Sequence, residues 1–125
     1  MSSQFDLLAA SLRADAVDLE AFVEALAVKL NESFPARVRV ERKGGLMRSK
    51  QRVRKLVVDL GDNQYEVVSN DGHVGCVRRV MVRGIALRSE QMPLEHWIDA
   101  LSAELVSEAD KSEADRVALE RMLEA

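Results

Sequence analysis

The sequence predicts an α+β protein, with an antiparallel sheet of four to five strands flanked by an N-terminal helix and by C-terminal helices packed on one face. Three observations predict this class. Apolar residues recur at helical spacing near both ends of the chain, they alternate at a period of two in the middle, and short turns separate the alternating segments. Short turns imply antiparallel neighbours, and helices from both ends can then cover one sheet face.

Length and composition predict one domain over residues 1–125. A chain of 125 residues is the size of an ordinary domain and buries roughly two thirds of the surface that its unfolded form exposes. Hydrophobic residues make up 47% and charged residues 31%, which is close to globular averages. No internal repeat or linker divides the sequence.

The N-terminal part predicts a short helical segment within residues 1–16 and an amphipathic helix from Asp18 to Phe34. The first rests on the apolar run Phe5–Leu12, and Asp15 or Asp18 is the expected N-cap of the second. Pro35 ends the second helix. Its apolar positions, spaced by three and four, are Leu19, Phe22, Val23, Leu26, Leu30 and Phe34.

After Pro35 the period changes to two. In residues 36–43 the valines Val38 and Val40 alternate with Arg37, Arg39 and Glu41, which predicts a half-buried strand, and a second strand covers Arg52–Leu60. Val53 has the opposite parity to the later apolar residues of that strand, which predicts a bulge near Arg54 and Lys55.

Two turns follow, at residues 61–63 and 70–72, with a third strand between them around Tyr65–Val68. The next run, residues 73–88, is long for one strand, and it can be counted as two. Its changing parity predicts a bend or bulge near Arg78, Arg79 or Gly84.

The C-terminal part predicts two helices. Ser89–Pro93 is the expected helix entry, with Pro93 near the first helical position. The apolar residues that follow at helical spacing are Leu94, Trp97, Ile98, Leu101 and Leu105. A terminal helix within residues 112–125 is expected from about Glu113 to Glu124.

Charge is segregated along the chain. Residues 1–36 carry a net charge of −4, residues 37–88 carry +8, and residues 89–125 carry −7. Strand alternation would place Arg37 and Arg39 on the solvent face of the sheet, opposite the acidic helices. A local positive surface can attract an anionic partner although the whole chain is negative.

The candidate binding residues therefore lie on the first hairpin. Two of them, Leu46 and Met47, are apolar residues in its tip that either insert into a partner or fold back on the sheet. The same pattern is also that of an ordinary solvated surface, because exposed strand positions need polar residues. The candidates for partner or anion binding are Arg37, Arg39, Leu46, Met47, Arg48, Lys50, Arg52 and Arg54.

No catalytic residue, metal site or cofactor is predicted. His73 and Cys76 point to opposite faces of a strand, and no second Cys or nearby His completes a zinc set. His96 and Ser102 fall on different faces of a helix, so Asp99 is expected to form only a surface pair with His96. Trp97 is expected to anchor the core.

These observations favour a noncatalytic protein-interaction module in the cytoplasm, such as an adaptor, a chaperone-like subunit or an assembly component. The expected partner is a protein, and homodimerisation is a subsidiary prediction. The alternative is a binder of nucleic acid or anionic lipid through the basic hairpin, disfavoured by a pI of 5.4 and few aromatic residues. The cytoplasm is expected because no signal peptide or membrane span is recognisable and Cys76 stands alone.

Overall fold

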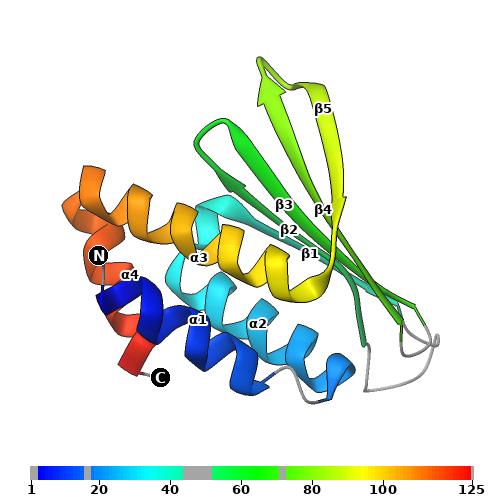
Figure 1. Ribbon diagram of the computed structural model, residues 1–125, viewed down its shortest axis with the longest axis horizontal. Coiled ribbons are helices and arrows are strands. Elements are labelled where there is room, and N and C mark those ends of the chain that lie inside the picture. Colours follow the sequence, from blue (N-terminus) through cyan, green and yellow to red (C-terminus); the bar gives the residue numbers. More distant parts are fainter. Residues whose placement is uncertain (1–2, 16–17, 44–51, 71–72, 125) are drawn as a thin grey trace.

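The fold was analysed in a computed structural model, which describes residues 3–15, 18–43, 52–70 and 73–124 (Figure 1). Two helices precede the sheet, α1 (Ser3–Asp15) and α2 (Leu19–Ser33), and a 3₁₀ turn, η1 (Pro35–Arg37), joins α2 to it. Two helices follow the sheet, α3 (Leu94–Lys111) and α4 (Glu113–Glu124).

Five antiparallel strands follow one another along the chain and across the sheet, in the order β1-β2-β3-β4-β5. The α+β class predicted from the sequence is thereby confirmed. The strands are β1 (Val38–Lys43), β2 (Arg52–Leu60), β3 (Asn63–Asn70), β4 (His73–Val82) and β5 (Ile85–Met92).

Two irregularities interrupt the pairing of the strands. Between β1 and β2, Glu41 pairs with Lys55 and Arg42 with Val53, so Arg54 is an extra residue on β2. This is the bulge that the parity of Val53 predicted, and it returns Val53 to the buried face.

The second irregularity lies in the β4–β5 ladder. Val80 pairs with Arg88 and Met81 with Ala86, so Leu87 is the extra residue on β5. The predicted division of residues 73–88 into two strands is confirmed, with a turn at Arg83–Gly84. Both turn residues have positive φ angles, 52° and 81°, as tight hairpins of the primed type require.

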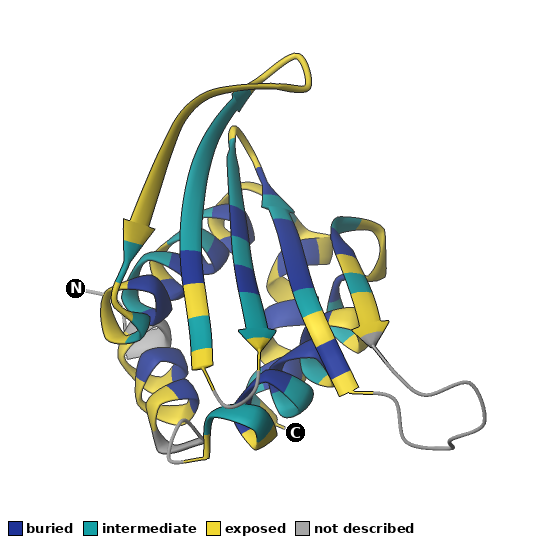
Figure 2. Cartoon of the chain, turned by 90° about the vertical axis from the view of Figure 1, so that its right-hand side faces the viewer, coloured by how far each residue is buried: buried dark blue, intermediate teal, exposed yellow. Residues whose placement is uncertain are grey.

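All four helices lie on one side of the sheet, and its other side faces away from them (Figure 2). Helices α2 and α3 contact the strands, while α4 packs on both of them and α1 packs mainly on α3. None of the helices in the described part of the chain is long and apolar enough to cross a membrane.

Among the described residues, all buried apolar side chains except those of Ala9 and Val57 form one cluster between the helices and the sheet. Trp97 is fully buried, as predicted, and its ring meets that of Tyr65 edge to face with centroids 6.3 Å apart. The Trp97 indole N–H donates to the Val77 carbonyl at 3.3 Å, so α3 is fixed to the first half of β4.

The helix boundaries follow local signals, with two corrections. Asp18 is the N-cap of α2, because its carboxylate accepts the backbone N–H groups of Glu20 and Ala21. The N-terminal segment is a helix of 13 residues, longer than the turn or two expected. Ser89–Met92 belong to β5 and not to a helix entry, because they continue the ladder with β4 up to Pro93.

Candidate interaction surface

Arg37 does not lie on the solvent face of the sheet as the alternation predicted. Pro35–Arg37 form the 3₁₀ turn, so the strand period begins only at Val38. The Arg37 guanidinium instead points to the helices, where it contacts Glu108 of α3 at 3.3 Å and Asp115 of α4 at 2.7 Å. Both carboxylates are largely buried, with side chains 11% and 12% exposed. Arg37 therefore joins the start of the sheet to both C-terminal helices.

Arg39 and Arg54 each face a carboxylate of a neighbouring strand. Arg39, on the outer face of the sheet, pairs with Asp59 of β2 at 2.9 Å. Arg54, the bulge residue, pairs with Glu41 of β1. Its hydrogen bond is the main reason why the pKa of Glu41 is lowered, with the nearby charge of Lys55 adding to the effect. These cations are neutralised within the sheet.

Arg52 of β2 and Arg42 of β1, the ladder partner of Val53, face the carboxylates of α2. Arg52 contacts Glu20 at 2.8 Å, and Arg42 contacts Glu24 at 3.2 Å. The second oxygen of Glu24 accepts the backbone N–H of Val53 at 2.6 Å. The acidic helix thus fastens the edge of the first hairpin.

In the part of the first hairpin that the structure describes, the positive charge is therefore largely paired inside the molecule. Each of the four predicted binding arginines that the structure describes, Arg37, Arg39, Arg52 and Arg54, contacts a carboxylate of the same chain. Basic strands and acidic helices do not form two separate surfaces as expected, because Arg37, Arg42 and Arg52 pair with carboxylates of the helices. The other predicted binding residues, Leu46, Met47, Arg48 and Lys50, lie outside the described residues.

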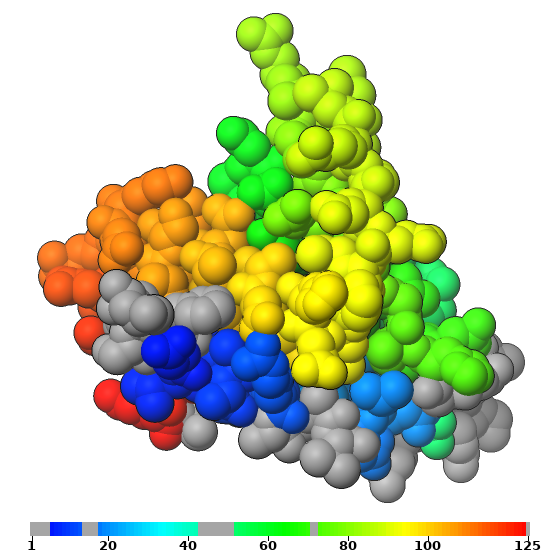
Figure 3. All heavy atoms as spheres, in the orientation of Figure 1, coloured from blue at the N-terminus to red at the C-terminus, as the bar shows by residue number. Residues whose placement is uncertain are grey.

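A different hairpin projects from the molecule. The far halves of β4 and β5 rise clear of the helices (Figure 1), and β5 is exposed along nearly its whole length (Figure 2). In the space-filling view they form a projection above the body (Figure 3). We call residues 80–91 the arm.

The arm carries apolar side chains in solvent. Val82 is 43% exposed, Ile85 65% and Leu87 66%. They are half of the large exposed apolar residues in the described part of the chain, and the other three, Leu7, Val28 and Val117, lie on three different helices. A concentration of this kind on one element is typical of an interaction site.

The arm also carries unpaired positive charge. Arg78 and Arg79, near its root, pair with Glu90 at 2.9 Å and with Glu66 at 3.0 Å. Arg83 and Arg88, further out, have no ion pair with any described residue. Exposed cations beside exposed apolar side chains suit a partner that offers carboxylates and apolar groups together.

The arm lies at an open edge of the sheet. In the described part of the chain β5 pairs only with β4, so the backbone groups on its other side have no strand partner. The opposite edge strand, β1, is shorter and carries charged residues at four of its six positions, a common protection against edge-to-edge pairing. The segment Ile85–Leu87 has no such protection.

The sequence predicts residues 73–88 as one bent strand or as two strands, but not as a hairpin that projects from the helices. The available signal was the number of apolar residues. Valine, methionine, isoleucine and leucine continue to both sides of Arg83–Gly84, over a longer stretch than α3 can cover.

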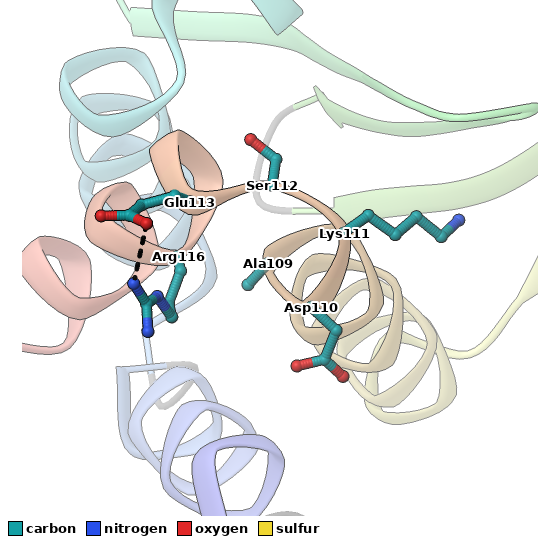
Figure 4. A pocket seen from close by; sticks show the side chains of 6 residues that line it. All are labelled: Ala109, Asp110, Lys111, Ser112, Glu113 and Arg116. Atoms are coloured by element: carbon teal, nitrogen blue, oxygen red, sulfur yellow. Dashed lines mark ion pairs between the residues drawn. The ribbon is translucent and has the colours of Figure 1, made fainter.

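A shallow hollow of about 430 Å³ lies at the junction of α3 and α4 (Figure 4). Its charged lining is balanced, with Asp110 and Glu113 beside Lys111 and Arg116, and Glu113 pairs with Arg116 at 3.4 Å. This balance gives the hollow no preference for a ligand of either charge.

The fold separates the side chains whose types are those of a metal site or a catalytic site. Cys76 is buried, which raises the pKa of its thiol to about 11, while His73 is exposed on the other face of β4. The predicted pair of His96 with Asp99 is wrong, because Asp99 pairs with Arg13 of α1. Among the described residues, no three His, Cys, Asp or Glu side chains gather where they could hold a metal ion.

Compared with protein-family models, with curated proteins and with solved structures, the chain matches none. The geometry of the surface is therefore the basis of the functional argument.

Proposed function

We propose that this protein is a noncatalytic protein-interaction module that acts in the cytoplasm as an adaptor, a chaperone-like subunit or an assembly component. The observation that carries the proposal is the arm, where Ile85 and Leu87 are about two thirds exposed. Beside them are Arg83 and Arg88, which form no ion pair with any described residue. Exposed apolar groups and an open strand edge favour contact with another polypeptide, because the edge supplies backbone donors and acceptors in register. The lone Cys76 fits a reducing compartment.

Affinity purification from the native cell tests the proposal. The tagged protein is compared with a variant carrying Ile85→Asp and Leu87→Asp, and with Val28→Asp as a matched control at an exposed apolar position on α2. We expect co-purifying proteins, including any untagged copies of the chain itself, to be lost with the arm variant and kept with the control. Equal recovery from all three proteins would overturn the proposal.

The arm substitutions should leave the fold intact. Ile85 and Leu87 are exposed, so each change should alter the free energy of unfolding by less than about 0.5 kcal/mol. Urea unfolding of the three purified proteins checks this and separates a lost contact from a lost fold.

A further inference from the structure

We propose that the edge of β5 binds the β5 edge of a second copy of this chain, in antiparallel orientation, so that two sheets form one sheet of ten strands. The inference rests on the proposed function, since it names the partner of the arm. It follows from the open edge, from the charges along β5 and from the apolar residues beside them.

Symmetry restricts the pairing. Two antiparallel β5 strands are related by a two-fold axis perpendicular to the sheet, which leaves both sets of helices on the same side. Facing residues must then point to the same side, so the axis passes midway between the two copies of one residue, the central residue of the pairing. Near the middle of β5 the central residue can be Leu87, Arg88, Ser89 or Glu90.

Charge and regularity select one of these four registers. Leu87 is the bulge residue, where the strand is irregular. An axis through Arg88 or through Glu90 would place two like charges opposite each other, which destabilises a strand pair. An axis through Ser89 places Arg88 opposite Glu90 of the second copy, and the symmetry makes this pair twice.

The pairing through Ser89 is compatible with the contacts inside each copy. Arg88 and Glu90 lie on the same side of the sheet, because they pair with Val80 and Arg78 on β4. The Glu90 carboxylate already accepts a hydrogen bond from Arg78 at 2.9 Å, and its two oxygens have room for a second guanidinium. Arg88, unpaired in one copy, gains a partner in the dimer.

The same register covers the apolar part of the arm. Because the bulge at Leu87 shifts the pairing by one residue, Ile85 comes opposite Met92 of the second copy, next to Pro93 at the entry to its helix α3. The Arg83–Gly84 turn then approaches the first turn of that helix, which carries the exposed Glu95. Both unpaired arginines of the arm thus meet carboxylates, and the ladder ends at a proline, which has no backbone N–H to leave unsatisfied.

A cysteine at the axis tests the register. Facing residues of antiparallel strands have Cα atoms about 4.5–5.5 Å apart, within the range of a disulfide. We expect Ser89→Cys to form a covalent dimer on mild oxidation. Val28→Cys, equally free of the core, should remain a monomer on a non-reducing gel. A dimer in solution that Ser89→Cys does not cross-link would overturn the register.

Charge reversal tests the paired residues. Arg88→Glu opposes two carboxylates to each other, and Glu90→Arg opposes two guanidiniums, so each variant alone should dissociate about tenfold more readily than the wild type. Mixed in equal amounts, the two variants restore both opposite-charge pairs and should form a heterodimer. Sedimentation at several protein concentrations measures all three cases, and a mixture no tighter than its components would contradict the proposal.

The two proposals fail in different ways. If the wild type sediments as a monomer at every concentration while the arm variant still loses co-purifying proteins, the second-copy proposal is overturned and the proposed function stands. If Ser89→Cys does not cross-link, and Ile85→Asp with Leu87→Asp changes neither the dimer nor the co-purifying proteins, both are overturned.

Discussion

The first and last hairpins of the sheet differ in whether their arginines form ion pairs. On β1 and β2, Arg39, Arg52 and Arg54 each contact a carboxylate of the same chain. On the arm, Arg83 and Arg88 have no such partner among the described residues and lie beside exposed apolar side chains. A high density of charge in a sequence therefore indicates where ion pairs form within the molecule. Unpaired charge at an open sheet edge, in contrast, indicates where a partner can bind.

Among the tests of this comparison, we expect a substitution of Arg37 to change the free energy of unfolding most. Arg37→Met removes the cation between two largely buried carboxylates, Glu108 and Asp115, and leaves them uncompensated except by Lys111. We expect a loss of roughly 2–4 kcal/mol in the free energy of unfolding, measured with urea.

The matched control is Arg39→Met on the same hairpin. Arg39 and its partner Asp59 are 62% and 42% exposed, so this change should cost less than about 1 kcal/mol. Equal effects of the two substitutions would show that Arg37 does not act as a buried bridge, and the first hairpin would regain its candidacy as a binding surface.

A second effect concerns the buried root of the last hairpin. Burial raises the pKa of Cys76 on β4 to about 11, and burial with the adjacent Glu104 charge raises the pKa of Tyr65 on β3 to about 12. The unfolded chain loses these protons near the ordinary values of 9.0 and 10.0. The contribution of these two groups to the free energy of unfolding is therefore fully present below pH 9. It falls as the pH rises toward 12, by an amount on the order of 2 kcal/mol for each group.

Urea unfolding at a series of alkaline pH values measures this loss. Tyr65→Phe should remove the part of the slope between pH 10 and 12, and Cys76→Ala the part between pH 9 and 11. The exposed arm variant Ile85→Asp should keep the wild-type slope. An unchanged slope in both buried-site variants would show that neither group titrates with the fold.

The smallest effect is expected in the binding of nucleic acid and anionic vesicles, when the charge of Arg52 and Arg54 is reversed. Because the described cations of the first hairpin are paired, we expect only weak binding of labelled DNA, RNA and vesicles at low salt, with little change for Arg52→Glu with Arg54→Glu. Steeply salt-dependent binding that this variant abolishes would favour the alternative function and reverse the comparison of the two hairpins.

The elements themselves could be predicted because each depends on neighbours in sequence. The spacing of Phe22, Leu26 and Leu30 marks α2, Pro35 ends it, and the parity of Val53 locates the bulge at Arg54. One local prediction was wrong. Ser89–Met92 resembled a helix entry but continued a ladder with β4, because a strand partner distant in sequence outweighed the local signal of Pro93.

The sequence by itself determined the fold class, the order of the strands and the total charge of each segment. Only the tertiary structure decided which charges are paired and which apolar residues are covered. A carboxylate of α4 reaches Arg37 across 78 residues of chain, and no local pattern specifies that contact. Whether α3 extends far enough to cover Ile85 likewise depends on the packing of a helix against a sheet, which brings together residues that the sequence keeps apart.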